Sequence, residues 1–185
     1  MWAGIDPLTR PLLGCDLPWR PVLSPEQLAY GCHQGQMPGV IAEVAAPLQR
    51  LCPEVCRRVA IEGGWLNLYL SDPWAIAAWR QLPTALPPER LATEPLSLPA
   101  YAHARNCAWL RLAGPPPQTY ALGPVRSLVG ALLAAAYRPL PIFGTQLARH
   151  CLEARIAHPG TEVLDGVAPA CWGLQRVFGP LPTYL

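Results

Sequence analysis

The chain has 185 residues, of which 51% are apolar and 14% are charged, and its formal net charge is +2. A chain of this length folds without a metal or disulfide, and its apolar fraction argues against disorder despite its 24 prolines. All 14 basic residues are arginine, and so weak a net positive charge excludes a densely basic, high-affinity nucleic-acid binder.

The N-terminal part of the chain predicts two short helices behind an irregular start. Residues 1–23 contain four prolines and are predicted to form an extended lead-in. Ser24 to Gln27 combine an N-cap serine, a first-turn proline and a glutamine at the capping-box position, which predicts a helix to about His33. A second helix, disturbed by its proline, is predicted over Val40 to Leu51.

A β-hairpin is the clearest strand signal in the sequence. Val59 to Glu62 and Trp65 to Leu70 flank Gly63-Gly64, a pair of glycines suited to a two-residue turn. Alternate residues of the second strand share a face, so its three leucines are predicted to be buried: Leu66, Leu68 and Leu70. The opposite face carries two aromatics and an amide, a set suited to stacking: Trp65, Asn67 and Tyr69.

The rest of the chain is predicted to be helical. Ser71 caps a helix over Trp74 to Leu82, and residues 83–99 hold five prolines without periodicity and form a linker. Short Pro/Gly connections then separate four helices, which predicts a bundle: 100–113, 125–138, Thr145 to before Pro159, and about Pro169 to Gly179. The expected fold is α+β, with a small α/β region over 1–82, the linker, and an all-α domain over 100–185.

Two segments resemble parts of arginyl-tRNA synthetases. Residues 59–72, VAIEGGWLNLYLSD, are similar to the strand-turn-strand of their N-terminal additional domain. Residues 100–111, AYAHARNCAWLR, resemble the opening helix of their DALR anticodon-binding domain. The run YAHAR together with Cys107 carries this resemblance. The two segments follow the family's chain order. The resemblance implies contacts with the D-loop at the tRNA elbow by the first segment, and with the anticodon loop by the helical domain.

The catalytic part of that family has no counterpart here. The interval between the two segments is only Ser71 to Pro99, with no HIGH-type motif, and a KMSK-type loop cannot exist without lysine. We therefore expect no enzymatic activity, no cofactor and no small-molecule substrate.

Seven residues are the candidate RNA contacts. Carried over by position, Trp65 and Asn67 would take the elbow role, with Tyr69 beside them. Tyr101, Arg105 and Trp109 lie at i, i+4 and i+8 on one helix face, where a guanidinium between aromatics suits bases and phosphates. Arg111 and the other arginines of residues 98–185, which carry seven Arg against three acidic residues, would follow a phosphate backbone. The alternative is structural: aromatics covering neighbouring helices, and an intramolecular cation–π ladder.

The seven cysteines predict reduced thiols rather than a metal site. Cys52 and Cys56 form a CxxxC spacing that His33 might join, but no fourth ligand stands out. His103 and Cys107, at i and i+4, form a nucleophile–base spacing that we do not expect to be catalytic. The odd cysteine count and the lack of a signal peptide predict a cytoplasmic protein, and no segment is long enough for a membrane span.

The function expected from the sequence is that of a non-catalytic, synthetase-like tRNA-binding protein. The alternative is a protein–protein adaptor or regulatory module that reuses the same fold for a protein partner.

Overall fold

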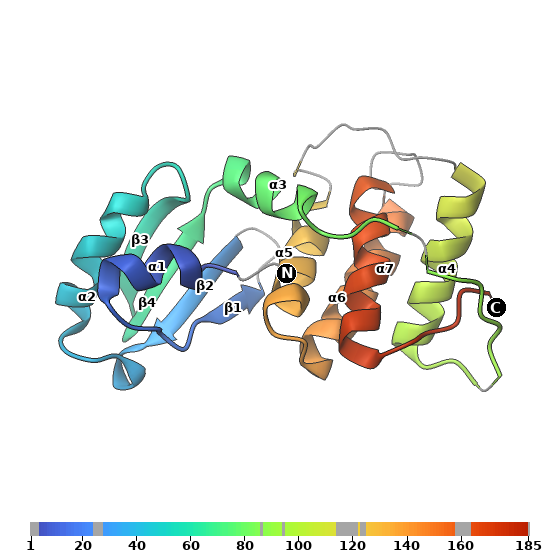
Figure 1. Ribbon diagram of the computed structural model, residues 1–185, viewed down its shortest axis with the longest axis horizontal. Coiled ribbons are helices and arrows are strands. Elements are labelled where there is room, and N and C mark those ends of the chain that lie inside the picture. Colours follow the sequence, from blue (N-terminus) through green and yellow to red (C-terminus); the bar gives the residue numbers. More distant parts are fainter. Residues whose placement is uncertain are drawn as a thin grey trace. The chain divides into compact units, whose positions relative to one another are not determined.

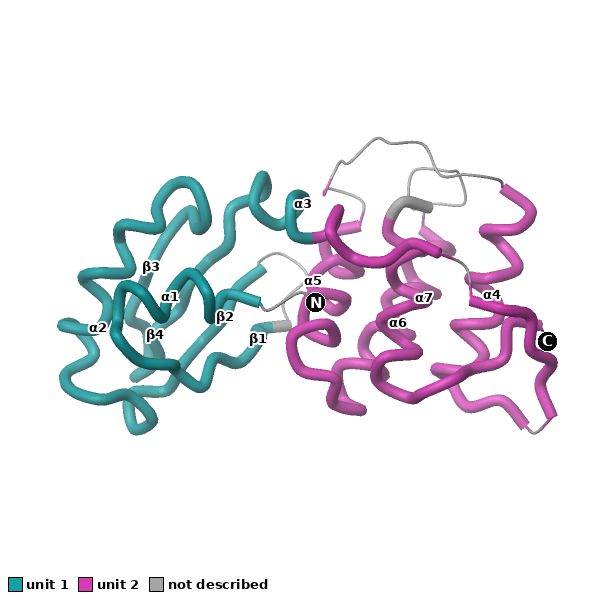
Figure 2. The backbone as a smooth tube through the Cα atoms, in the orientation of Figure 1, with its two compact units in different colours: residues 1–78 teal, residues 79–185 magenta. Residues whose placement is uncertain are grey.

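The computed structural model describes residues 4–23, 28–85, 87–93, 95–113, 122, 125–157 and 164–184. The chain has an α+β fold, as predicted, and divides into two compact units, residues 1–78 and residues 79–185 (Figure 2). The first unit contains an antiparallel sheet, and the second contains a helical bundle.

The first unit is built on four antiparallel strands in the order β1-β2-β4-β3. In chain order its elements are α1 (Asp6–Leu13), β1 (Arg20–Leu23), β2 (Leu28–His33), η1 (Gln34–Gln36), α2 (Ile41–Leu48), η2 (Gln49–Leu51), β3 (Cys56–Glu62) and β4 (Trp65–Leu70). Helices α1 and α2 pack together and lie over one face of the sheet (Figure 1). Helix α3 (Asp72–Arg80) follows β4.

The predicted hairpin is confirmed. β3 pairs with β4, and Glu62 faces Trp65 across the two-residue turn. Gly63 and Gly64 both have positive φ, 58° and 78°, as a type I′ turn requires. All three β4 leucines are buried, as the alternation predicted. The predicted cap of the next helix is also present, because the Trp74 N–H donates to Ser71 Oγ at 3.2 Å.

The predicted extended lead-in is wrong, because residues 6–13 form a helix and residues 20–23 form a strand. Pro7 lies in the first helical turn, where its missing N–H has no intrahelical partner to lose. Pro11 does lie inside the helix, but Ile5 and Thr9 are buried one turn apart. This tertiary packing outweighs the loss of one backbone hydrogen bond.

The predicted helix ending at His33 is also wrong. Residues 24–27 lie outside the described residues, and Leu28–His33 is a strand between β1 and β4. Its alternate residues Tyr30 and Cys32 are buried opposite Leu68 and Leu66. The helix-capping pattern of Ser24 to Gln27 is a local signal. The conformation of residues 28–33 is instead decided by hydrogen-bonded pairing with β1 on one edge and β4 on the other.

The second unit is a bundle of α4 (Leu98–Ala113), α5 (Arg126–Tyr137), α6 (Pro141–Ala157) and α7 (Leu164–Phe178). Helices α6 and α7 each pack against the other three helices (Figure 1). The bundle agrees with the prediction, but α6 and α7 begin earlier than expected. Pro141 is the first residue of α6, a position that tolerates proline, and Pro169 lies inside α7.

Glycine permits close helix contact inside the bundle. A Cβ at Gly173 would lie 2.8 Å from Leu132 Cδ1 and 2.9 Å from Leu147 Cδ2. Both leucines are fully buried, so neither side chain can move into solvent to make room. Gly173 therefore sets the distance between α7 and its neighbours α5 and α6.

The segment after α7 is held against the linker and α4. The Thr183 N–H donates to the Arg90 carbonyl at 2.8 Å, and the Arg90 N–H donates to Thr183 Oγ1 at 2.7 Å. Leu91 and Tyr184 form a parallel bridge, and His103 Nδ1 contacts the Pro182 carbonyl oxygen at 2.7 Å. Thr183 is fully buried, so its hydroxyl belongs to the interior of the unit.

We expect Thr183→Val to destabilise the protein by about 1–3 kcal/mol, because the Arg90 N–H loses its acceptor, the hydroxyl of the buried Thr183, while the side-chain shape is kept. Urea unfolding followed by circular dichroism measures the change. Thr145→Val is the matched control, because Thr145 is half-buried in α6 and makes no side-chain hydrogen bond to any described residue. An equal loss in both variants would contradict a role for the Thr183 hydroxyl.

Candidate nucleic-acid interface

Helix α4 has one buried face and one face that is accessible to solvent. Ser97 supports its first turn, where the Ala100 N–H donates to Ser97 Oγ at 3.4 Å. The buried side of the helix packs into the bundle and includes six residues: Ala102, His103, Ala104, Asn106, Cys107 and Leu110. Tyr101 is 39% exposed, and Arg105 and Trp109 are half-buried. The structure thus places these three predicted residues along one partly exposed face.

Helix α6 completes this face as a groove. The groove has a volume of about 500 Å³ and is lined by Tyr101, Arg105 and Trp109 from α4 and by Leu152, Arg155 and Ile156 from α6. Ile156 is 82% exposed and forms part of its rim. The arrangement offers two aromatic rings, two guanidinium groups and two aliphatic side chains to one ligand.

The two arginines of the groove repel one another. Partial burial, and then the positive charge of Arg105, lower the pKa of Arg155 below its usual range. The Arg155 guanidinium carbon lies 5.2 Å from the centre of the Trp109 ring, a cation–π distance. Within the described part of the chain, no carboxylate forms a salt bridge with either arginine. An anion bound here would therefore relieve an existing repulsion.

Arg111 does not line this groove. Its Nη1 donates to the Thr183 carbonyl at 2.9 Å, and its guanidinium lies 4.3 Å from the centre of the Tyr184 ring. These contacts hold the segment after α7 against α4.

In the first unit, Trp65 and Asn67 project from the sheet face opposite the leucines. Both side chains are half-buried, and the Trp65 ring meets the His33 ring edge-to-face at 5.2 Å. Gly31 of β2 pairs with Asn67, and a Cβ there would lie 3.0 Å from Asn67 Oδ1 and 3.3 Å from a Trp65 ring carbon. The glycine therefore leaves the space that the indole and the amide occupy.

Tyr69 differs from its two neighbours because it is 8% exposed and already has partners. Its hydroxyl donates to Glu62 Oε2 at 2.6 Å, which, followed by burial, raises the pKa of Tyr69 above its ordinary value. The Arg58 guanidinium lies 4.3 Å from its ring centre and pairs with Glu62 at 3.0 Å. The ring therefore offers an external ligand little surface.

Sequence reasoning missed the α6 side of the groove and the β2 side of the sheet face. In the sequence, Arg155 is one of several scattered basic residues, and no pattern distinguishes Leu152 or Ile156. Which helix of a bundle packs beside which is a tertiary property that helical spacing within one helix does not report. On β2, the alternation of Leu28, Tyr30 and Cys32 was the available strand signal.

The cysteine pairs named in the sequence lie in different surroundings. The thiols of Cys52 and Cys56 lie 3.1 Å apart, and burial raises the pKa of Cys56 to about 12. His33 does not join them, because its Nδ1 accepts from the Gly35 N–H at 3.2 Å and its ring packs on Trp65.

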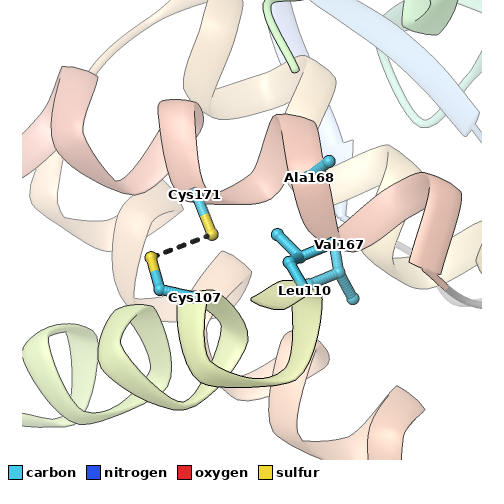
Figure 3. Packing of buried hydrophobic residues seen from close by; sticks show 5 residues of the cluster. All are labelled: Cys107, Leu110, Val167, Ala168 and Cys171. Atoms are coloured by element: carbon cyan, nitrogen blue, oxygen red, sulfur yellow. Dashed lines mark hydrogen bonds between the residues drawn. The ribbon is translucent and has the colours of Figure 1, made fainter. Parts of the chain in front are cut away.

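His103 and Cys107 are both fully buried in the bundle, where no substrate reaches them in this conformation. The Cys107 sulfur lies 3.8 Å from that of Cys171 on α7 (Figure 3). The hydrogen bond between the two thiols lowers the pKa of Cys107 below its ordinary value and raises the pKa of Cys171 above it. The ionisation of each thiol therefore depends on the state of the other.

No family model, curated protein or solved structure matches this chain. Of the helices that the structure describes, none combines the length and the apolar character needed to cross a membrane.

Proposed function

We propose that the chain is a non-catalytic RNA-binding protein that takes tRNA as its ligand. The groove between α4 and α6 is the main support for this proposal. It is lined by two arginines that have no acidic partner among the described residues and by the aromatic side chains of Tyr101 and Trp109. Such a set suits an unpaired base, which stacks on an aromatic ring, together with its phosphate, which pairs with guanidinium.

The choice of tRNA among RNAs rests on the resemblance of residues 59–72 and 100–111 to arginyl-tRNA synthetase segments. Under this proposal the groove holds the anticodon loop, and Trp65 and Asn67 contact the elbow. Arg111 and Tyr69 support the contact surfaces from within, because both are engaged in intramolecular contacts. The net charge of +2 predicts modest affinity with a shallow salt dependence.

A protein–protein adaptor is the second candidate function, and exposed apolar side chains favour it. Ile156 is 82% exposed at the rim of the groove, and Leu112 is 88% exposed near the end of α4. Apolar residues at such positions suit a protein surface better than a phosphate backbone.

A tRNA titration across a salt series separates the two functions. The tRNA proposal predicts binding tighter than the non-specific range of roughly 10⁻⁴ to 10⁻⁶ M and a preference for tRNA over duplex DNA, because the groove suits unpaired bases. Equal affinity for tRNA and duplex DNA, or tRNA binding no tighter than that range, would contradict the tRNA proposal. The adaptor predicts tRNA binding no tighter than non-specific.

We expect Trp65→Ala to weaken tRNA binding by about 1–3 kcal/mol through lost stacking and to leave the salt dependence nearly unchanged. Fluorescence titration at several salt concentrations measures both quantities. Trp172→Ala is the matched control, because Trp172 is half-buried like Trp65 but is not a candidate RNA contact. The centre of its ring lies 5.7 Å from the Arg176 guanidinium carbon. Circular dichroism must first show that both variants fold. An equal loss in both would remove the special role of Trp65.

A further inference from the structure

Three buried side chains of types that can bind a metal ion lie close together between α4 and α7. The ligand atoms of His103, Cys107 and Cys171 all lie within 4.8 Å of one another, and all three residues are fully buried. Figure 3 shows the Cys107 and Cys171 side chains pointing toward one another across the two helices. No other group of three or more such residues is found in the part of the chain that the structure describes.

The distance between the two sulfur atoms is the one that a shared metal ion would require. Zinc–sulfur bonds of about 2.3 Å in tetrahedral geometry place two sulfur atoms about 3.8 Å apart. The Cys107 and Cys171 sulfur atoms lie 3.8 Å apart. An ion could therefore bind both without movement of either helix.

His103 supplies a third ligand whose free nitrogen is already defined. Nδ1 lies 2.7 Å from the Pro182 carbonyl oxygen, which can only accept, so Nδ1 carries the proton. Nε2 then keeps its lone pair, and a backbone carbonyl on the other ring nitrogen is the usual support of a metal-binding histidine. The Cys107 sulfur is 3.9 Å from both ring nitrogens, so the ring must turn to aim Nε2 at the ion.

From this geometry we infer that His103, Cys107 and Cys171 bind a thiophilic d¹⁰ metal ion that fastens α4 to α7. Soft thiolate ligands select Zn²⁺ and Cu⁺ among physiological metals. Two thiolates cancel the charge of Zn²⁺, and a site without net charge is the least costly to bury. Binding releases the two thiol protons and changes no oxidation state. The sequence does not predict this site, because the cysteine spacing in it that suggests a metal is that of Cys52 and Cys56.

Metal binding is tested on the full chain after chelation and reduction with a phosphine. Co²⁺, as a spectroscopic substitute for Zn²⁺, is expected to give thiolate-to-metal charge-transfer absorption that saturates at one ion per chain and disappears on adding Zn²⁺. Zn²⁺ or Cu⁺ should raise the thermal midpoint of unfolding, whereas Mg²⁺ should not. The larger shift of the two identifies the preferred ion. No absorption with Co²⁺ and no thermal shift with Zn²⁺ or Cu⁺ would overturn the inference.

Three variants locate the site. Cys171→Ala should abolish both the absorption and the thermal shift. Cys151→Ala, which removes another fully buried thiol of the same bundle, and Cys52→Ser, which breaks the thiol pair of the first unit, should retain both. Loss of binding in Cys52→Ser with retention in Cys171→Ala would place the ion elsewhere and refute the assignment. Should Cys171→Ala fail to fold, Cys107→Ser provides the same comparison while keeping a side chain of similar size.

Discussion

Replacing Arg105 and Arg155 together with glutamine is expected to weaken tRNA binding about 25-fold at about 0.1 M salt. The reasoning is electrostatic, because each phosphate contact on unpaired RNA contributes about 0.7 to the slope of log K against log salt. Two lost contacts lower that slope by about 1.4. If the variant and the unchanged protein bind tRNA equally well near 1 M salt, log K of the variant is lower by about 1.4 at about 0.1 M, one decade below. Fluorescence titration from low to high salt measures both the slope and the affinity.

The charge-matched control for this variant is Arg50→Gln with Arg90→Gln, because neither arginine is among the candidate phosphate contacts of residues 98–185. Both of these arginines are exposed, and the pair lowers the net charge by the same two units. The tRNA proposal expects a much smaller change in slope for the control than for the groove variant. If both double variants lose the same affinity, the protein's overall charge and not the groove governs binding. If neither loses any, the groove does not contact phosphate.

Gly173→Val is expected to reduce the stability of the helical unit by about 3 kcal/mol, at the upper end of the usual cost of overpacking. Its Cβ alone would lie 2.8 Å and 2.9 Å from two leucine methyl groups, and valine adds two further methyl groups to the same space. The fully buried Leu132 and Leu147 can yield only by adopting strained rotamers or by separating the helices. Thermal unfolding followed by circular dichroism measures the loss.

Ala157→Val is the control for the valine side chain itself. Ala157 is exposed at the end of α6, so valine there costs only the small difference in helix propensity. A Gly173→Val protein as stable as this control would mean that α7 can shift away from α5 and α6 without penalty.

Local signals in the sequence predicted those parts of the molecule whose structure is decided locally. The hairpin was predictable because alternation and a two-glycine turn lie within one short segment. Tyr101, Arg105 and Trp109 were predictable as one face because a single helix sets their spacing. In contrast, the prolines of residues 1–23 suggested an extended segment, while the packing of Ile5 and Thr9 produces a helix.

The remaining features depend on which segments meet. β2 lies between β1 and β4, and no pattern within residues 28–33 indicates which strands it pairs with. Arg155 reaches the groove because α6 packs beside α4, and Tyr69 is buried with Glu62 as its partner. The same dependence on tertiary packing brings Cys171 to Cys107 across 64 residues of sequence.

Each unit contains buried cysteines whose thiols become reactive only when that unit unfolds locally or globally. Cys32 and Cys56 are buried in the first unit, Cys107, Cys151 and Cys171 are buried in the second, and only Cys15 and Cys52 are partly exposed. A maleimide pulse should therefore modify those two residues in the native protein and reach the other five only as the structure opens. Mapping the modified peptides by mass spectrometry at increasing urea concentrations would then give separate opening free energies for the sheet and the bundle, with no engineered probe in either.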